Sequence, residues 1–306
     1  MDNENASQEI VKLNPAQSLF IPLDKVFKNA FKTTVDKKIR HIIEDKRHGN
    51  KIITNVKFEC FKGNLNQFDK FIFCAAMSEF RAGNDVFSIR RLWQKMGGSH
   101  TLTAEMKNKI AESIEKLRCT LVEINMTDAN DEFHYCDKKE VIFKNYLLPC
   151  KSVEVKINGQ TVDDAFHILD KSPLMEATEL KKQFTEQPIE LLDVPKLHNS
   201  ELVLKLKFFL LERITAIIGS HKKHKSHRVG RTKDGKPIYK RAIELRKIIT
   251  FEDIFEQCDL SDAPVNRKAE YRAVIAKILD HFKAKNYISE WHFEKKNGSF
   301  YSLHFA

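Results

Sequence analysis

The C-terminal segment 248–306 constrains the fold most, because it carries the signals of a strand, two helices and a hairpin in one uninterrupted order. A β-branched run at 248–250 indicates a short strand and leads into a helical pattern that begins at Phe251. Near the end of the chain, large and polar residues alternate on both sides of Asn297-Gly298. That pair best tolerates the positive φ angles of a tight type I′ turn, so a two-stranded hairpin is predicted there.

A long helix is predicted between these two parts. Ser261 and Asp262 are both candidate N-cap residues, and Pro264 suits the first helical position, so the helix should run from there to about Asn286. The resulting order of strand, helix, turn, helix and two-stranded hairpin is that of a winged helix.

The long helix has two contrasting faces when it is plotted at roughly 100° per residue. The face predicted to lie in the core carries Tyr271, Val274, Ile275, Ile278, Leu279 and Phe282. The opposite face is small along its middle and is flanked by Arg272, Lys277 and Lys283. Small side chains allow close approach to DNA, and Asn and Arg bond base edges bidentately in the major groove. A solvated surface made of good helix formers is the alternative interpretation.

The predicted DNA contacts of this domain lie on that outward face and at the tip of the hairpin. On the helix they are Asn266, Arg267, Ala269, Arg272, Ala273, Ala276 and Lys277. At the tip, which would form a wing, they are Lys295 and Lys296.

The chain as a whole is basic. Its 306 residues have a formal net charge of +10 and a sequence pI of about 9.1. A polyanionic partner is therefore favoured, and nucleic acid fits best, because no apolar run is long enough to span a bilayer and no basic amphipathic tail suggests membrane docking. The polar, acidic start MDNENASQEI lacks the apolar stretch of a signal peptide, so a cytoplasmic location is expected.

No motif of metal binding or catalysis stands out. The six cysteines are scattered without a CxxC pair, and the histidine cluster His221, His224 and His227 lies among lysines that would repel a cation. There is no GxxxxGK[ST] phosphate loop, and no histidine pair accompanies a candidate tyrosine as in a rolling-circle nickase. The sequence predicts no cofactor and no enzymatic activity.

An earlier segment, 52–162, repeats the C-terminal order of elements. IITNVKFECF alternates as a strand, NQFDKFIFCAAMSEFRA has helical spacing, and DVFSIRRLWQKMGG predicts a short strand and a helix. A helix and a strand are expected over AEMKNKIAESIEKLRCTLVEIN, with TDANDEF as the loop of a second wing. A first winged-helix domain is therefore predicted.

The long helix of this first copy differs on its outward face, which carries Glu105, Asn108, Glu112 and Glu115. Carboxylates there would meet phosphates of like charge, so deep insertion into a groove is not expected. Contact with the DNA backbone through Arg90, Arg91 and His100 is one remaining role, and self-association is another. A solvated surface helix is the plain alternative.

The rest of the chain connects or extends these two copies. Residues 1–51 are interpreted as an N-terminal extension, 163–195 as a connecting segment and 196–306 as the second winged-helix domain. Strands around Asn158-Gly159 should close the first sheet, PIELLDVPK should be a strand, and a helix over NSELVLKLKFFLLERITAII should end at Gly219. The fold class predicted is α+β, with two winged helices in tandem.

The most basic stretch of the chain, the insert 220–247, lies within the second domain. Its candidate phosphate or minor-groove contacts are Lys222, Lys223, Lys225, Arg228, Arg231, Lys233, Lys236 and Lys240. Asp234-Gly235 is a hairpin signal, so a protruding basic hairpin or arm is expected. A solvated loop or a localisation-type patch is the alternative.

The paired layout resembles the tandem winged-helix replication initiators of theta-replicating plasmids, the iteron-binding Rep class. DVFSIRRLWQKMGG with the helix and strand after it is similar to their first domain, and ITFEDIFEQCDL, NRKAEYRAVIAKILDHFKAKNYI and the Lys295-Lys296 hairpin are similar to their second. The resemblance covers roughly residues 52–306. It implies specific binding to the direct repeats of an origin, duplex opening with a host replication initiator and helicase, and a homodimer through the first domain. The long basic insert departs from the leanest family pattern, and a winged-helix transcriptional regulator is the competing interpretation.

Overall fold

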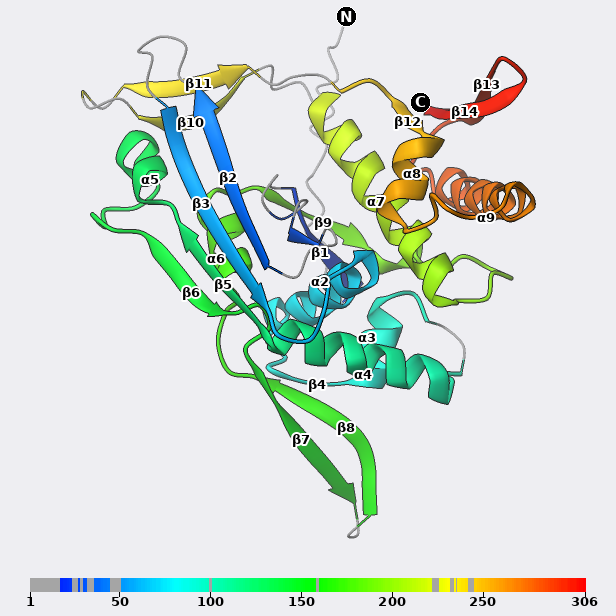
Figure 1. The fold of residues 1–306 in the computed structure, drawn as a ribbon, viewed down its shortest axis with the longest axis horizontal. Coiled ribbons are helices and arrows are strands. Elements are labelled where there is room, and N and C mark those ends of the chain that lie inside the picture. Colours follow the sequence, from blue (N-terminus) through cyan, green and yellow to red (C-terminus); the bar gives the residue numbers. More distant parts are fainter. Residues whose placement is uncertain are drawn as a thin grey trace, which may run out of the picture.

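The computed structural model describes residues 17–23, 27, 30–31, 36–44, 51–98, 101–157, 160–221, 226–231, 234, 236–241 and 245–306. Within these ranges the fold is mixed α+β, with small antiparallel sheets of two to four strands and helices packed between them (Figure 1). The α+β class predicted from the sequence is confirmed at this level. Among the described helices, none has the length and apolarity that crossing a membrane requires.

The C-terminal segment has the predicted order of elements. These are β12 (Ile248–Thr250), α8 (Phe251–Gln257), α9 (Val265–Ala284), β13 (Trp291–Lys296) and β14 (Ser299–Phe305). The strands form one sheet in the order β12-β14-β13. Asn297 and Gly298 connect the last two strands with φ angles of 52° and 77°, which confirms the predicted tight turn.

Helix α9 buries the face predicted for it. The side chains of Ile275, Ile278, Leu279 and Phe282 are fully buried, and Tyr271 and Val274 pack against the same core. Its start differs from the prediction: Pro264 itself is the N-cap residue, and no side chain caps the helix. Neither Ser261 nor Asp262 therefore serves as the cap.

Helix α7 (Glu201–His221) lies between the two halves of the chain, with α2 on one side and α8 and α9 on the other (Figure 1). It runs two residues past Gly219, the predicted end. Phe208 of α7 stacks on Phe71 of α2 with the ring centroids 4.6 Å apart. Beside this stack, Lys70 and Glu212 form a buried ion pair.

The first half also has the predicted elements. They are β3 (Lys51–Cys60), α2 (Gln67–Arg81), β4 (Val86–Ser88), α3 (Ile89–Lys95), α4 (Ala104–Arg118), β5 (Thr120–Asn125) and β6 (Ile142–Tyr146). Local signals start each helix: Asn66 and Asp69 form a capping box on α2, Ser88 caps α3 and Thr103 caps α4.

The pairing of these strands does not repeat the C-terminal arrangement. Strand β4 pairs with β8 (Gln160–Ile168) rather than with β5 or β6, which join β3 and β2 (Asp36–Glu44) in a four-stranded sheet. The predicted wing loop TDANDEF is a helix, α5 (Thr127–Phe133), in which the Asn130 side chain bonds the backbone of Cys136 and Lys138. The order of elements is thus repeated, but the sheet built from them is not.

The hairpin predicted around residues 158–159 is present, but it does not close the first sheet. Strands β7 (Cys150–Ile157) and β8 (Gln160–Ile168) form a separate sheet with β4, and this hairpin projects from the lower end of the molecule in Figure 1. Its two turn residues lie outside the described ranges. Helix α6 (Pro173–Leu180) follows.

The described part of the N-terminal segment, interpreted from the sequence as an extension, contributes strands to two sheets. Strand β1 (Ser18–Pro22) pairs with β9 (Phe184–Pro188), and Leu19, Phe20 and Ile21 are almost completely buried. Strand β2 (Asp36–Glu44) pairs along its whole length with β3. The prediction of a strand over PIELLDVPK is wrong: β9 ends at Pro188, the first residue of that segment, and the chain continues as a short 3-10 helix, η2 (Ile189–Leu191).

The basic insert contains the predicted hairpin, with strands β10 (Ser226–Arg231) and β11 (Pro237–Arg241) paired antiparallel. It does not stand free of the first half, because β10 contacts α5. In Figure 1 this hairpin lies across the top of the molecule, beside α5 and the ends of β2 and β3.

Candidate nucleic-acid interface

The outward face of α9 is an open, mostly small surface. Asn266, Ala269, Ala273 and Lys277 are exposed, and Ala276 is partly exposed. The face extends over most of a 20-residue helix. Its first turn has no side-chain cap, although the Arg267 backbone N–H donates to the side-chain oxygen of Asn266 at 2.9 Å. A groove in a partner molecule could therefore approach the helix backbone closely.

The C-terminal hairpin adds a cluster of cations around one aromatic ring. The Arg272 guanidinium carbon lies 4.7 Å and the Lys295 Nζ 4.6 Å from the centroid of Phe300. Next to this cluster, Lys296 Nζ lies 5.3 Å from the centroid of Tyr301. Positive charges attracted to ring faces are held in place without being neutralised. The edge of α9 and the hairpin therefore form one continuous cationic strip.

The hairpin is tied to the helices beneath it by aromatic packing. Phe251 at the start of α8 makes edge contacts with Phe293 and Phe300. Trp291 packs on Phe293 and donates from Nε1 to the Asp280 carboxylate of α9, 3.1 Å away. These contacts set the position of the hairpin relative to α9.

A polar network on the other side of the hairpin stabilises its register. Ser302 and His304 both bond the Glu294 carboxylate, each at 2.8 Å. The hydrogen bond from Ser302, followed by that from His304, lowers the pKa of Glu294 below its usual value. The ring of His292 stacks on that of His304.

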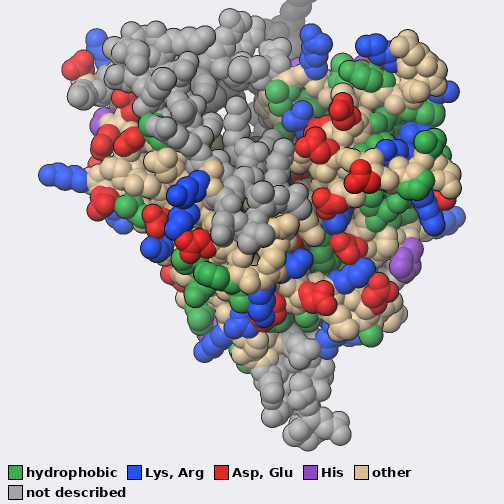
Figure 2. Space-filling view, viewed as in Figure 1, with side chains coloured by type: hydrophobic (Ala, Val, Ile, Leu, Met, Phe, Trp, Pro, Cys, Tyr) green, Lys and Arg blue, Asp and Glu red, His purple; other side chains and the backbone are tan. Residues whose placement is uncertain are grey.

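The acidic residues on the outward face of α9 have partners within the molecule. Glu270 bonds Arg267 at 2.8 Å, one turn along the helix, and Asp280 accepts the bond from Trp291. Arg267 thus forms an exposed pair with a neighbour. On the face shown in Figure 2, Asp and Glu gather over α7 and α8, whereas Lys and Arg lie at the right-hand margin over α9 and the hairpin.

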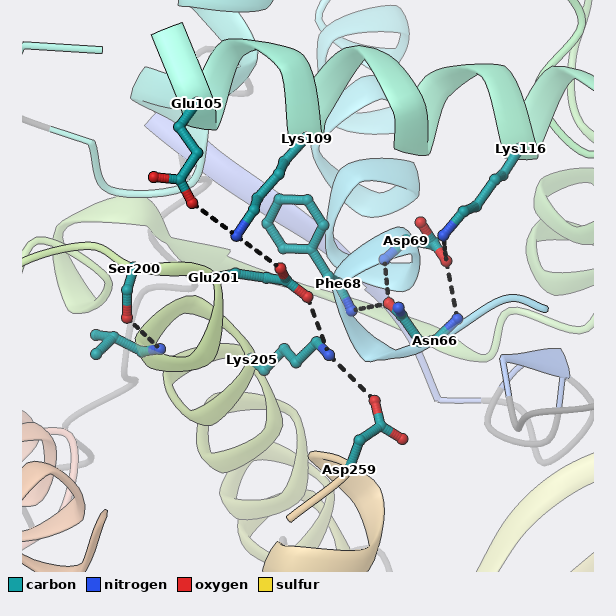
Figure 3. Close-up of polar contacts among 11 residues, drawn as sticks. Asn66, Phe68, Asp69, Glu105, Lys109, Lys116, Ser200, Glu201, Lys205 and Asp259 are labelled. Carbon is teal, nitrogen blue, oxygen red and sulfur yellow. Dashed lines mark hydrogen bonds and ion pairs between the residues drawn. The ribbon is translucent and has the colours of Figure 1, made fainter. Parts of the chain in front are cut away.

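On the outward face of α4 in the first half, Glu105 and Glu115 take part in ion pairs, whereas Asn108 and Glu112 are exposed. Lys109 bonds both Glu105 and Glu201, and Lys205 bonds both Glu201 and Asp259, with all four separations between 3.1 and 3.2 Å. Figure 3 shows this chain of alternating charges running from α4 through α7 to the end of α8. The hydrogen bonds to Glu105 and Glu201 raise the pKa of Lys109.

Further pairs hold the other end of α4. Glu115 bonds Arg118 and Lys62. Lys116 lies 3.8 Å from the Asp69 carboxylate of the α2 capping box (Figure 3). Burial raises the pKa of Asp69, opposed by the nearby Ser113 hydroxyl and by the charge of Lys116. Lys109, Glu115 and Lys116 therefore attach α4 to its neighbours.

The predicted backbone contacts of the first half divide into three cases. Arg90 is exposed on α3. Arg91 pairs with the buried carboxylate of Glu79, so it contributes to the packing of α3 on α2. His100 lies outside the described residues.

The basic insert is described only in part. Lys222, Lys223, Lys225 and Lys233 lie outside the described residues. The backbone places Arg228 and Arg231 on β10 and Lys240 on β11, while Lys236 is exposed in the turn between the strands. Of the described residues of this insert, those on β10 contact α5 of the first half.

Three exposed apolar residues of this surface were not predicted from the sequence. Val265 opens α9, and Phe300 and Tyr301 lie on β14. A helical wheel places Val265 beside Ala269, but only the fold shows that the valine stays exposed. The alternating pattern of the hairpin predicted large residues on both of its strands, but it did not show which of their side chains reach the surface.

The cysteines have no role in this surface. All six are free thiols, and burial raises the pKa of Cys74, Cys150 and Cys258.

Comparisons with known proteins find structural likeness only. No protein-family model matches the chain, and neither does any curated protein. A crystal structure of RctB domains 2-3 (RctB-155-483) is similar with a TM-score of 0.43 and 8% identity, covering 92% of this chain and 95% of that one. A crystal structure of selenomethionine derivatives of domains 2 and 3 of RctB gives a TM-score of 0.40 and 10% identity, covering 90% and 91%. Because both TM-scores are low, the functional assignment rests on this chain's own residues.

Proposed function

We propose that the chain binds double-stranded DNA sequence-specifically, with α9 as the helix that enters the major groove and the β13–β14 hairpin as a wing on the adjacent backbone. The observation that carries this proposal is the outward face of α9, which is exposed, small along its middle and bordered by Arg272 and Lys295. A recognition helix must bring its backbone close to the base edges while cations at its margins meet phosphates. The order of β12, α8, α9 and the hairpin is that of a winged helix.

The process we propose is initiation of replication on a plasmid or another mobile element. Support comes from the pattern of the sequence, in which both halves resemble the tandem winged-helix initiators, and from the basic character of the chain. The partners would be the direct repeats of an origin, a host replication initiator and helicase, and a second copy of the chain. The basic residues of the insert 220–247 would add contacts to phosphates.

The test begins with selection of bound duplexes from a random pool by the full-length protein. Enrichment of one motif shows specific binding and supplies a site for titration. Occurrence of that motif as direct repeats beside an AT-rich tract favours an initiator, whereas a lone inverted repeat at a promoter favours a transcriptional regulator.

Substitution of Ala273 by Glu then tests α9. A carboxylate on the exposed middle of the helix would meet the bases and phosphates, so binding to the selected site should weaken by about a hundredfold or more. The melting temperature should change by no more than about 2 °C, because Ala273 is exposed. Asn108→Glu on the exposed side of α4 is the matched control and should leave both quantities unchanged. Wild-type affinity in the folded Ala273→Glu protein would refute the role of α9.

A further inference from the structure

We infer that Val265 determines specificity by contacting the 5-methyl group of a thymine in the major groove. This inference rests on the proposed function, since it requires α9 to lie in the groove. Val265 is the first residue of α9 and is 81% exposed, the largest fraction among the exposed large hydrophobic residues of the described chain. The next most exposed of them, Phe61, is 68% exposed and lies in a turn of the first half.

Among the residues that the structure describes, Val265 has no structural task in the fold. It contributes nothing to the core, and a β-branched residue is a weaker helix former than most. Pro264 before it fixes the start of the helix, so the valine is not needed as a cap. A single exposed valine is common on protein surfaces and indicates no function by itself. The residues around Val265 are what indicate a role for it.

Those surroundings form the N-terminal turn of the proposed recognition helix. Asn266 and Ala269 are exposed beside Val265, and on the helix Arg272 lies two turns further along the same edge. In helix-turn-helix proteins the N-terminal residues of the second helix contact base edges. An apolar side chain at that point would face the base edges of the major groove, where only the T·A pair offers an apolar group.

The chemistry singles out thymine. In the major groove each base pair presents hydrogen-bond donors and acceptors, and only the T·A pair adds a methyl group. Valine can neither donate nor accept a hydrogen bond. It can therefore distinguish one base from another only by burying the thymine methyl group. Asn266, the next residue, carries an amide that can bond adenine on N6 and N7. We therefore expect one A·T pair, or two adjacent A·T pairs, under the first turn of α9, with the thymine methyl group facing Val265 and the adenine N6 and N7 facing Asn266.

Deoxyuridine tests this directly, because it differs from thymidine only by the missing methyl group. Each thymine of the selected duplex is replaced singly by deoxyuridine, and binding of the full-length protein is titrated. At one position, or one per repeat, affinity should fall about fourfold, as expected when one methyl group is no longer removed from water. 5-Bromodeoxyuridine at that position should restore binding, because bromine is close to a methyl group in size.

The double-mutant cycle assigns the contact to Val265. Val265→Ala should bind the thymine duplex about fourfold more weakly and should no longer distinguish it from the deoxyuridine duplex. Val86→Ala, at another exposed valine far along the chain, should keep the full discrimination. Circular dichroism melts of both variants should match the parent.

Each failure has its own meaning. If no thymine is sensitive to loss of its methyl group, or if Val265→Ala keeps the sensitivity, the inference is overturned while specific binding, and with it the proposed function, remains. If the full-length protein enriches no motif at all, the proposed function and the inference fall together.

Discussion

The helix pairs α3–α4 and α8–α9 follow the same order of elements but use their second helix differently. Both pairs begin at a short strand whose last residue caps the next helix, Ser88 on α3 and Thr250 on α8. Helix α4 is bound to α2, α7 and the turn after β3 through charged side chains. Helix α9 leaves its outward face exposed. One order of elements thus produces a supporting helix in the first half and an open surface in the second.

The turns within the two pairs show the same contrast. After α3, Gly97 has a φ angle of 79°, and a Cβ atom there would lie 2.5 Å from the backbone of Leu192. The Asn199 side chain donates to the Gly97 carbonyl at 3.0 Å, and Lys207 Nζ in turn lies 2.5 Å from the Asn199 oxygen. After α8, by contrast, the residues of the turn 259–264 are mostly exposed. The first turn is packed into the interior, whereas the second remains accessible to a partner.

The largest expected effect concerns the attachment of the first half to α7. Lys70 Nζ lies 2.8 and 2.7 Å from the two Glu212 carboxylate oxygens, and the side chains are 4% and 6% exposed. Glu212→Ala leaves the Lys70 charge buried without its partner. The free energy of unfolding should therefore fall by about 3–5 kcal/mol, measured from urea denaturation.

The control for this prediction is a pair on the surface of the same half. Glu115 bonds Lys62 and Arg118 in a half-exposed position, so Glu115→Ala should cost about 0–1 kcal/mol. A loss for Glu212→Ala as small as that of the control would show that the buried pair does not hold the two halves together.

Many of the elements compared above could be predicted from the sequence, because local signals determine them. Caps such as Asn66 and Thr103, and the turn at Asn297 and Gly298, act within a few residues, and the apolar spacing of α9 fixed its buried face. The pairing of strands could not be predicted in the same way. The partners β1 and β9 lie at opposite ends of the first half, and β4 joins β8 rather than the strands that follow α4. Such contacts depend on which apolar surfaces meet in three dimensions.

The candidate site was predictable to a similar degree. A helical wheel sufficed to find the small face of α9, because period and composition are local properties. It could not show that Arg272 is drawn toward Phe300 on the hairpin, nor that Arg91 is engaged by the buried Glu79. Each depends on a residue that is distant in the sequence.

A second prediction compares Arg272 on α9 with Lys109 on α4, since α9 and α4 are the second helices of the two pairs. Arg272→Ala should weaken binding to the selected duplex by about 1–3 kcal/mol, because the guanidinium at the edge of α9 would meet DNA. Lys109→Ala on α4 removes a cation that bonds Glu105 and Glu201, so it should leave DNA affinity unchanged. Its stability cost should be about 0–1 kcal/mol.

Duplex titrations and urea denaturation of both variants check this contrast. Equal losses of DNA affinity would mean that the two helices face DNA alike. The base preference of Arg272→Ala sharpens the result further: relaxed preference at one base pair indicates contact with a base edge, whereas a uniform loss over all sequences indicates contact with a phosphate.

The smallest expected effect concerns two lysines of α7. Lys207 lies beside the turn after α3, and Lys205 lies beside the turn after α8. Lys207 is fully buried and donates to the Leu192 carbonyl at 2.6 Å and to Asn199 beside the first turn. Burial lowers the pKa of Lys207 from 10.5 to about 8. Lys205 bonds Asp259 in the second turn, and although burial acts to lower its pKa, the carboxylates of Glu201 and Asp259 outweigh that effect and raise it above 10.5.

The two lysines should therefore respond to alkaline pH in different ways. Between about pH 8 and pH 10 the folded chain loses the Lys207 proton while the unfolded chain keeps it, so the unfolded state binds more protons and stability rises with pH. The difference in unfolding free energy between the parent and Lys207→Met should then increase by at most about 1.4 kcal/mol per pH unit. The difference for Lys205→Met should stay flat in this window, because the contribution of a raised pKa is lost only as pH passes through that higher value. Urea denaturation of the three proteins at several pH values measures both slopes. A flat difference for Lys207→Met would mean that its ammonium group is accessible to water, and that the first turn is as open as the second.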